Sequence, residues 1–255
     1  MEAGALPRVG SSVQALTPRL LKLTSDARLV GMVRERRGGA FEALYDRHHK
    51  GIMSFCRHML GDADEAEDAV QHTFMSAYRE LIDSDKPIHL RAWLYTVARN
   101  RCYSIIRARR EQPSDSIDDT ATEGLATEVQ RRQDLRDLVA DLSRLPDEQR
   151  AALVLAELDA LSHEDIAGVL GVPRDKVKAL VFQARESLVA SRTARDTACS
   201  EIREQLASAC GGSLRRSNLR RHLRECDGCR EFRAQVETQR KQFAALLPVL
   251  PAAAL

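Results

Sequence analysis

The residues with the clearest capacity for chemistry are a histidine and two cysteines near the C-terminal end of the sequence. His222, Cys226 and Cys229 follow the pattern H-x3-C-x2-C. Imidazole and thiolate ligands at this spacing are typical of a structural zinc site in a reducing compartment. A closed tetrahedral site needs a fourth ligand, and the two candidates in this segment are Cys199 and Cys210.

The expected fold of this segment distinguishes between the two candidates. A helix from about Ser200, a turn at Gly211-Gly212 and a second helix ending near His222 predict a hairpin. Each arm is about 15 Å long at 1.5 Å per residue. Cys199 then returns beside His222, whereas Cys210 lies at the far turn. We therefore predict one zinc ion, held by Cys199, His222, Cys226 and Cys229.

A predicted helix-turn-helix carries a second group of functional candidates. Ser162 can cap its first helix, Gly171 begins the turn, and Pro173 suits the first position of the second helix. The outer face of that second helix offers three cations to phosphates and bases: Arg174, Lys176 and Lys178. The segment is typical of duplex DNA binding. The alternative is a plain helical hairpin with solvated lysines.

A strongly basic segment spans residues 86–110, which hold seven Lys and Arg residues and no carboxylate. A basic helix with aromatic residues suits melted, single-stranded DNA. Asn100 is the best candidate for contact with a base edge. Trp93 fits a core position better than a stacking platform. The candidate DNA contacts in this segment are Trp93, Arg99, Asn100, Arg101 and Arg107.

An acidic helix face lies further toward the N-terminus. Glu67, Asp68 and Gln71 share one side of a predicted helix, at positions i, i+1 and i+4. Such a face suits docking to a basic coiled-coil partner. Without further context, a solvated acidic face is the alternative.

The composition places all of these motifs in an all-α chain. Of 255 residues, 44% are hydrophobic but only 4% are aromatic, with 13 Gly and 8 Pro, which argues against a β-sandwich or barrel. The net charge of +2 excludes a uniformly basic, histone-like protein. No apolar run reaches the roughly 18 residues that span a bilayer, and no signal peptide is evident. We therefore expect a cytoplasmic protein with reduced thiols.

Changes in pattern divide the chain into five predicted parts. Residues 111–130 form an acidic linker with six carboxylates and no Lys or Arg. Residues 192–198 form a short polar stretch that is expected to tether the cysteine segment beside the preceding domain. The parts are a flexible tail at 1–24, a helical domain at 25–110, the linker at 111–130, the helix-turn-helix domain at 131–191 and the zinc-binding segment at 192–255.

The helix-turn-helix segment contains a series of short family motifs. They are Leu145-Pro146, Leu161-Ser162, Glu164-Asp165-Ile166-Ala167, Leu170-Gly171-Val172-Pro173 and Ala184-Arg185-Glu186-Ser187-Leu188. With these motifs, the segment resembles region 4 of the extracytoplasmic-function (ECF) sigma factors. The resemblance implies a domain that reads the minus-35 promoter element and contacts the polymerase β flap. Asp175-Lys176 and Phe182-Gln183 depart from the family pattern, so the promoter sequence does not carry over.

The first domain resembles sigma region 2 in three stretches: Ala40–Tyr45, Ala66–Gln71 and Arg91–Arg101. The resemblance implies that the acidic face docks on the β′ clamp helices of core RNA polymerase. It also implies that the basic helix opens and captures the minus-10 element. His72 and Ser104 stand where the family often has acidic residues. Together the two resemblances cover about residues 25–190 and imply a sigma factor that initiates transcription at promoter DNA.

The cysteine segment resembles the zinc-binding anti-sigma domain, here fused behind a sigma factor. The resemblance implies modulation in cis, and the alternative is a domain that only stabilises the C-terminal part of the chain. A regulatory protein on the zinc domain is a further candidate partner. One alternative is a helix-turn-helix regulator that does not replace a polymerase sigma subunit. A zinc deaminase is disfavoured because His163-Glu164-Asp165 and Glu225-Cys226 lack the H-x-E and P-C-x-x-C signatures. We expect no enzymatic activity.

Overall fold

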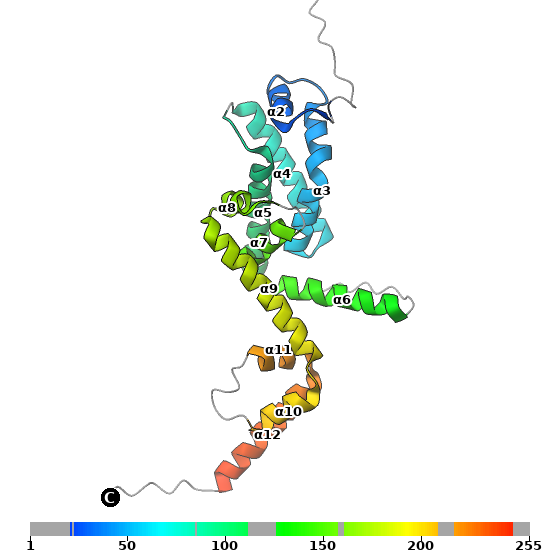
Figure 1. The fold of residues 1–255 in the computed structure, drawn as a ribbon, viewed down its shortest axis with the longest axis vertical. Coiled ribbons are helices and arrows are strands. Elements are labelled where there is room, and N and C mark those ends of the chain that lie inside the picture. The colour runs from blue at the N-terminus through cyan, green and yellow to red at the C-terminus, as the bar shows by residue number, and fades with distance from the viewer. Residues whose placement is uncertain are drawn as a thin grey trace, which may run out of the picture. The chain divides into compact units, whose positions relative to one another are not determined.

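The computed structural model describes residue 21 and residues 23–84, 86–111, 126–157, 161–208 and 217–246. All regular structure in these ranges is helical, which confirms the predicted all-α class (Figure 1). The helices are α2 (Asp26–Arg34), α3 (Ala40–Leu60), α4 (Ala63–Asp83), α5 (Leu90–Glu111), α6 (Ala126–Ser143), α7 (Asp147–Glu157), α8 (His163–Leu170), α9 (Arg174–Asp196), α10 (Cys199–Ser208), α11 (Ser217–Glu225) and α12 (Asp227–Leu246). In this part of the chain, no helix combines the length and apolar character needed to cross a membrane.

Contacts divide the chain into two compact units. Unit 1 comprises residues 1–129 and 146–181, and unit 2 comprises residues 130–145 and 182–255. The division passes through α6 and α9, so the predicted helix-turn-helix domain contributes helices to both units. The predicted domain limits rest on sequence pattern and remain predictions. Most of the predicted N-terminal tail and acidic linker lies outside the described residues.

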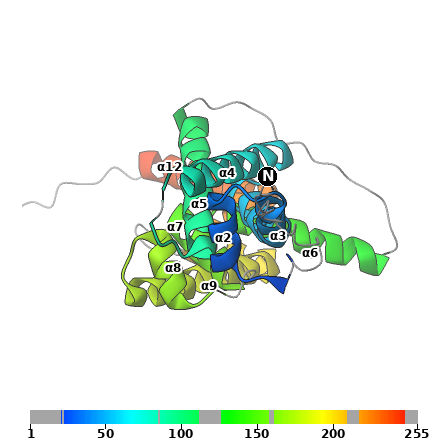
Figure 2. The ribbon, with the colours of Figure 1, turned by 90° about the horizontal axis from the view of Figure 1, so that it is seen from above.

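The core of unit 1 is built by α3, α4 and α5, with α2 packed beside them (Figure 2). Their sequence has a nearly continuous helical pattern, but glycine and capping residues break it. Gly61 ends α3 with φ 73°, a left-handed conformation that favours glycine. Asp62 then caps α4 by accepting a hydrogen bond from the Glu65 N–H at 2.9 Å. In the core, the Phe55 and Tyr95 rings meet edge to face at 5.7 Å.

The same unit contains α7 and α8, which pack on α3 and α5 respectively. The C-terminal carbonyls of a helix have no partner within that helix. At the end of α3, the Met59 carbonyl accepts a hydrogen bond from Arg150 Nη1 of α7 at 2.7 Å. The neighbouring Leu60 carbonyl accepts one from Arg109 Nη1 of α5 at 2.8 Å. Both guanidinium groups also oppose the negative end of the α3 dipole, so these contacts attach α5 and α7 to one helix terminus.

The predicted helix-turn-helix forms with the caps that the sequence indicates. Ser162 accepts a hydrogen bond from the Asp165 N–H at 3.1 Å, and the two residues form a reciprocal capping box. Gly171 ends α8 with φ 67°. The inner face of α8 buries Ile166, and α9 buries Val177 in the same unit.

Unit 2 has a small core where α10, α11 and α12 meet. Its buried members are Ile202, Leu206, Leu219, Leu223 and Cys229. The part of α9 that belongs to this unit continues through Asp196. Residues 192–196 are therefore helical, so most of the polar stretch at 192–198 continues α9 and only residues 197 and 198 separate it from α10. Arg195 explains the extension, because its guanidinium pairs with Asp141 of α6 at 2.8 Å.

Replacing Arg150 with alanine should destabilise unit 1. The side chain is only 7% exposed, and its charged hydrogen bond holds α7 on α3. We expect a loss of about 2 kcal/mol in the free energy of unfolding. Urea unfolding followed by the emission of Trp93, the only tryptophan, measures unit 1 directly. Arg79→Ala on the exposed face of α4 is the control, with an expected change within about 0.5 kcal/mol. Equal stability of the two variants would contradict the role given to Arg150.

Candidate functional site

Unit 2 brings together the four residues that the sequence nominates as metal ligands. The ligand atoms of Cys199, His222, Cys226 and Cys229 all lie within 4.8 Å of one another. Cys199 Sγ is 3.8 Å from His222 Nε2 and 3.8 Å from Cys226 Sγ. A tetrahedron with 2.3 Å metal–sulfur bonds has edges of about 3.8 Å. This Cys3His cluster can therefore enclose a tetrahedral metal ion. Cys210 and Gly211-Gly212 lie outside the described residues.

Each ligand of the Cys3His cluster sits at a helix terminus. Cys199 begins α10, His222 lies in the last turn of α11, and Cys229 lies in the first turn of α12. Cys226 separates α11 from α12, and its N–H donates to the His222 carbonyl at 3.0 Å. Cys229 is fully buried in the unit 2 core, whereas Cys199 is exposed. The metal position therefore lies at the edge of the small core, where it can join all three helices.

A backbone carbonyl orients the histidine of this cluster. His222 is 4% exposed, and its Nδ1 lies 2.8 Å from the carbonyl oxygen of Ala194 in α9. With the ring proton on Nδ1 donated to that carbonyl, the Nε2 lone pair faces Cys199. Metal-binding histidines are commonly oriented in this way. The end of α9 is thus part of the outer shell of the Cys3His cluster.

Two cysteines of the cluster have opposite shifts in pKa. The backbone N–H of Cys229 donates to the Cys226 sulfur and lowers the pKa of that thiol to about 7. Burial raises the pKa of Cys229 to about 11. Since metals bind thiolates, Cys226 is the cysteine of this pair that is prepared to lose its proton at neutral pH.

The three predicted cations of the helix-turn-helix lie in the first turn and a half of α9, and all are exposed. Two of them have acidic partners. Lys176 Nζ is 2.9 Å from Glu148 Oε2 of α7, and Lys178 Nζ is 3.6 Å from Asp175 Oδ1. Arg174 precedes them at the start of the helix.

The predicted contacts to melted DNA lie along α5. Arg107 and Asn100 are exposed, whereas Trp93, Arg99 and Arg101 are half-buried. Arg99 donates to Asn100 Oδ1 at 2.6 Å, so these two side chains lie side by side on the helix. Trp93 is partly accessible and is not a fully buried core residue.

Tyr103 was not predicted as part of this surface. The Arg99 guanidinium lies over its ring, 5.7 Å from the centroid. Burial raises the pKa of Tyr103 to about 12, so its hydroxyl stays protonated at neutral pH. The spacing of four residues between Arg99 and Tyr103 was the signal that could have identified this pair.

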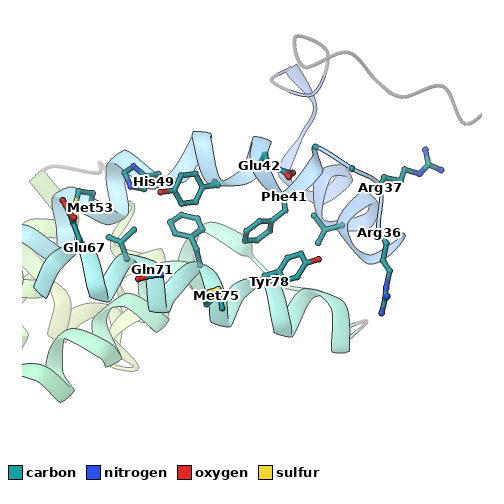
Figure 3. Close-up of a pocket in the computed structure, with 16 residues that line it drawn as sticks. Arg36, Arg37, Phe41, Glu42, His49, Met53, Glu67, Gln71, Met75 and Tyr78 are labelled. Atoms are coloured by element: carbon teal, nitrogen blue, oxygen red, sulfur yellow. The ribbon is translucent and has the colours of Figure 1, made fainter. Parts of the chain in front are cut away.

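The acidic face borders an aromatic groove in unit 1 (Figure 3). This groove has a volume of about 850 Å³ and lies between α3 and α4, with Glu67 and Gln71 at one end and Arg36 and Arg37 at the other. Asp68 is exposed beside Glu67. Four rings form the aromatic pairs Phe41–Tyr78, at 4.9 Å, and Tyr45–Phe74, at 4.7 Å.

Sequence reasoning found the acidic end of this groove but missed its apolar wall. Met75 is 51% exposed and Tyr78 is 45% exposed, both within the groove. An accessible apolar surface rimmed by polar side chains is typical of a protein-binding site. The signal was the spacing of four residues from Phe41 to Tyr45 and from Phe74 to Tyr78, which is also the spacing of core residues.

A smaller groove of about 460 Å³ lies in unit 2 between α6 and the end of α9. Leu135 of α6 and Val189 of α9 line it and are 61% and 64% exposed. Its rim holds charges of both signs, from Asp134, Asp137, Asp196 and Arg192. No motif in the sequence predicts this α6–α9 groove.

Two sequence families match the chain in the expected order. The family described as Sigma-70 region 2 matches residues 44–112, and the family described as Sigma-70, region 4 matches residues 135–188. The first contains α4, α5 and most of α3, and the second contains the helix-turn-helix. Neither match extends into the segment that holds the Cys3His cluster.

Curated relatives give the same result over most of their length. The RNA polymerase sigma-H factor of Pseudomonas aeruginosa is 32% identical over 66% of this chain and 94% of its own length. ECF RNA polymerase sigma factor SigW of Bacillus subtilis is 32% identical over 58% of this chain and 87% of its own length. A solved structure of CnrH in complex with the cytosolic domain of CnrY has a TM-score of 0.53 and 26% identity, covering 66% of this chain and 97% of that one.

These findings place the chain in the ECF group of RNA polymerase sigma factors. Its function is to initiate transcription with RNA polymerase at promoter DNA. The alternative of a helix-turn-helix regulator that does not replace a sigma subunit is wrong, because region 2 is present beside region 4.

Proposed function

We propose that this sigma factor docks on core RNA polymerase through the aromatic groove and its acidic end. The observation that carries this proposal is the accessible apolar wall directly beside Glu67 and Gln71. Aromatic and methionine side chains are enriched in protein interfaces, and an acidic rim steers a basic partner. The predicted basic coiled coil of the polymerase β′ clamp fits both properties. This site acts in the cytoplasm, together with the polymerase.

DNA recognition is assigned to two helices of unit 1. The exposed Asn100 and Arg107 of α5 would meet the melted minus-10 strand, and Arg99 is stacked on Tyr103 beside Asn100. The exposed start of α9 would meet the minus-35 duplex, with Lys176 and Lys178 contacting phosphates or bases. The α6–α9 groove is assigned to the β flap, because Leu135 and Val189 offer an accessible apolar surface at the two limits of the region 4 match.

The Cys3His cluster is assigned to zinc. Three sulfur atoms and one imidazole nitrogen form the donor set of structural zinc sites, and their spacing fits a tetrahedron. Four protein ligands leave no open position for water, so the ion would hold helices together without hydrolytic chemistry. We propose that the zinc-loaded helices resemble an anti-sigma domain and modulate the sigma factor in cis. The contact between this segment and α9 supports modulation in cis, since the Ala194 carbonyl accepts a hydrogen bond from His222 Nδ1.

Reversing the charge of Asp68 should weaken binding to core polymerase. Asp68→Arg places a cation beside Glu67 at the end of the groove that is expected to meet a basic partner. We expect a loss of about tenfold in affinity, equivalent to about 1.4 kcal/mol. Fluorescence anisotropy with labelled sigma factor and core polymerase measures the effect. Asp46→Arg, on an exposed part of α3 outside the groove, is the matched control. If both variants bind as tightly as the native chain, the docking assignment is wrong.

The two DNA surfaces should respond differently to substitution. Lys178→Ala should weaken binding to duplex promoter DNA, since one phosphate contact is lost. The slope of log affinity against log salt concentration should become shallower by about one. Asn100→Ala should leave duplex affinity unchanged and slow promoter opening, because it removes a base contact on the melted strand. Salt-dependent binding and permanganate reactivity, both with holoenzyme, separate these effects. Normal binding and opening by both variants would show that the surfaces are misassigned.

The metal assignment predicts about one zinc ion per chain in the purified protein. Cys226→Ser and Cys199→Ser should each lower that ratio, because each removes a ligand from a closed site. Cys210→Ser is the control and should retain the metal. Emission spectroscopy gives the metal content, and run-off transcription shows whether loss of zinc changes activity. Zinc retained in Cys199→Ser but lost in Cys210→Ser would show that Cys210, and not Cys199, is the fourth ligand.

A further inference from the structure

The segment that holds the Cys3His cluster also carries a basic surface that metal binding does not use. Residues 205–224 contain five arginines and no carboxylate. Three of these arginines lie on α11: Arg220, Arg221 and Arg224. The two leucines of this helix and His222 are buried, whereas Arg220 and Arg224 are exposed. Since residues four apart share one side of a helix, the two exposed guanidinium groups form a pair on the face away from the core.

The positive charge of this face is not balanced by the residues around it. Glu225, the only carboxylate of α11, already pairs with Arg144. Arg220 and Arg224 have no acidic partner among the residues that the structure describes. Two unpaired guanidinium groups side by side are suited to a ligand that carries repeated negative charges.

Neighbouring contacts hold α11 in place. Arg221, which lies directly after Arg220, donates to the carbonyl and hydroxyl oxygens of Ser187 in α9, at 3.3 and 3.2 Å. The next residue, His222, contacts the same helix through a backbone carbonyl. At the other end of α11, Arg230 Nη1 donates to the carbonyl of residue 224 at 2.8 Å. The exposed arginines therefore extend from a fixed backbone, so less freedom is lost when they bind a ligand.

We propose that α11 is a third DNA-contacting helix, whose Arg220 and Arg224 bind backbone phosphates of the promoter duplex beside the minus-35 element. This inference rests on the proposed assignment of the start of α9 to that element. The whole of α9 is one continuous helix. Ser187, which anchors α11, lies nine residues after Lys178, or about 14 Å along the helix axis. Duplex DNA bound at the start of α9 is therefore at high local concentration for α11.

The chemistry of this face fits phosphates rather than base edges. The forked guanidinium group matches the geometry of phosphate oxygens. Arg220 and Arg224 are about 6 Å apart along the helix axis. Duplex DNA presents one charge about every 3.4 Å of axis on each strand, so the pair can occupy two phosphates of one strand. Such contacts raise affinity without changing which promoter sequence is read.

The test compares two pairs of substitutions that remove the same charge from unit 2. Arg220→Gln with Arg224→Gln alters α11, and Arg233→Gln with Lys241→Gln alters exposed positions of α12. Each variant is assembled into holoenzyme, and anisotropy measures its binding to a fluorescein-labelled promoter duplex that native holoenzyme transcribes. At moderate salt we expect the α11 pair to bind about tenfold more weakly than the α12 pair, since two exposed charge contacts are lost. The slope of log affinity against log salt concentration should also be shallower by about two.

A pair that keeps the charge separates phosphate contact from loss of fold. Arg220→Lys with Arg224→Lys should recover most of the affinity, because a lysine also binds phosphate as a point charge. Equal helix content by circular dichroism is the folding control. Equal binding by the α11 and α12 glutamine pairs, or a lysine pair as weak as the α11 glutamine pair, would overturn the third DNA surface. Tighter binding by the α11 glutamine pair would also overturn it and would indicate an acidic protein segment on these arginines.

Lys178→Ala, measured in the same way, tests the proposed function separately. If Lys178→Ala weakens binding while the two glutamine pairs bind equally, the minus-35 assignment of α9 stands and only this inference fails. If Lys178→Ala binds as the native chain does, the assignment of α9 fails, whatever the result for α11.

Discussion

The hydrogen bond from Arg150 to the Met59 carbonyl is the contact on which the arrangement of unit 1 depends. It joins residues 91 positions apart and satisfies a carbonyl that α3 cannot pair within itself. Arg109 satisfies the neighbouring carbonyl, so α5 and α7 meet at one helix terminus. A buried arginine needs such a partner, because removal of its charge from water is costly without one.

A second constraint links the Cys3His cluster to the sigma portion of the chain. His222 uses one ring nitrogen for the α9 backbone and presents the other to Cys199. Arg221, the preceding residue, donates to the Ser187 carbonyl and hydroxyl of α9. Arg144, which directly follows α6, pairs with Glu225, the residue before the Cys226 ligand candidate. A metal ion bound at the proposed site would therefore be coupled to α6 and α9. His222 contacts α9 directly, and residues next to His222 and Cys226 contact α9 and the end of α6.

Much of the local structure could be predicted from sequence, because the signals are local. The Ser162 cap, the Gly171 turn and the helical class follow from capping chemistry and composition. The choice of Cys199 over Cys210 needed only the length of two helical arms, and the structure brings Cys199 to His222. The acidic end of the groove could also be predicted, because the spacing of Glu67 and Gln71 puts them on one helix face, and both line the groove.

The features that sequence reasoning missed depend on contacts between distant residues. The four rings of the aromatic groove have the spacing of core residues, and only the packing of α3 on α4 leaves Tyr78 accessible. The polar stretch at 192–198 predicts a tether, but α9 continues through Asp196, and Arg195 in this extension pairs with Asp141, which is 54 positions earlier in the chain. The attachment of α7 to α3 has no local signal at all, because a leucine-proline turn before Asp147 is compatible with many orientations.

The most direct test of the account is a footprint of core RNA polymerase on the full-length chain. Backbone amide hydrogen exchange, read by mass spectrometry, compares the free chain with its polymerase complex. The account predicts slower exchange in α4 where Glu67, Gln71 and Tyr78 line the aromatic groove. Exchange in this part of α4 that polymerase leaves unchanged would contradict the account.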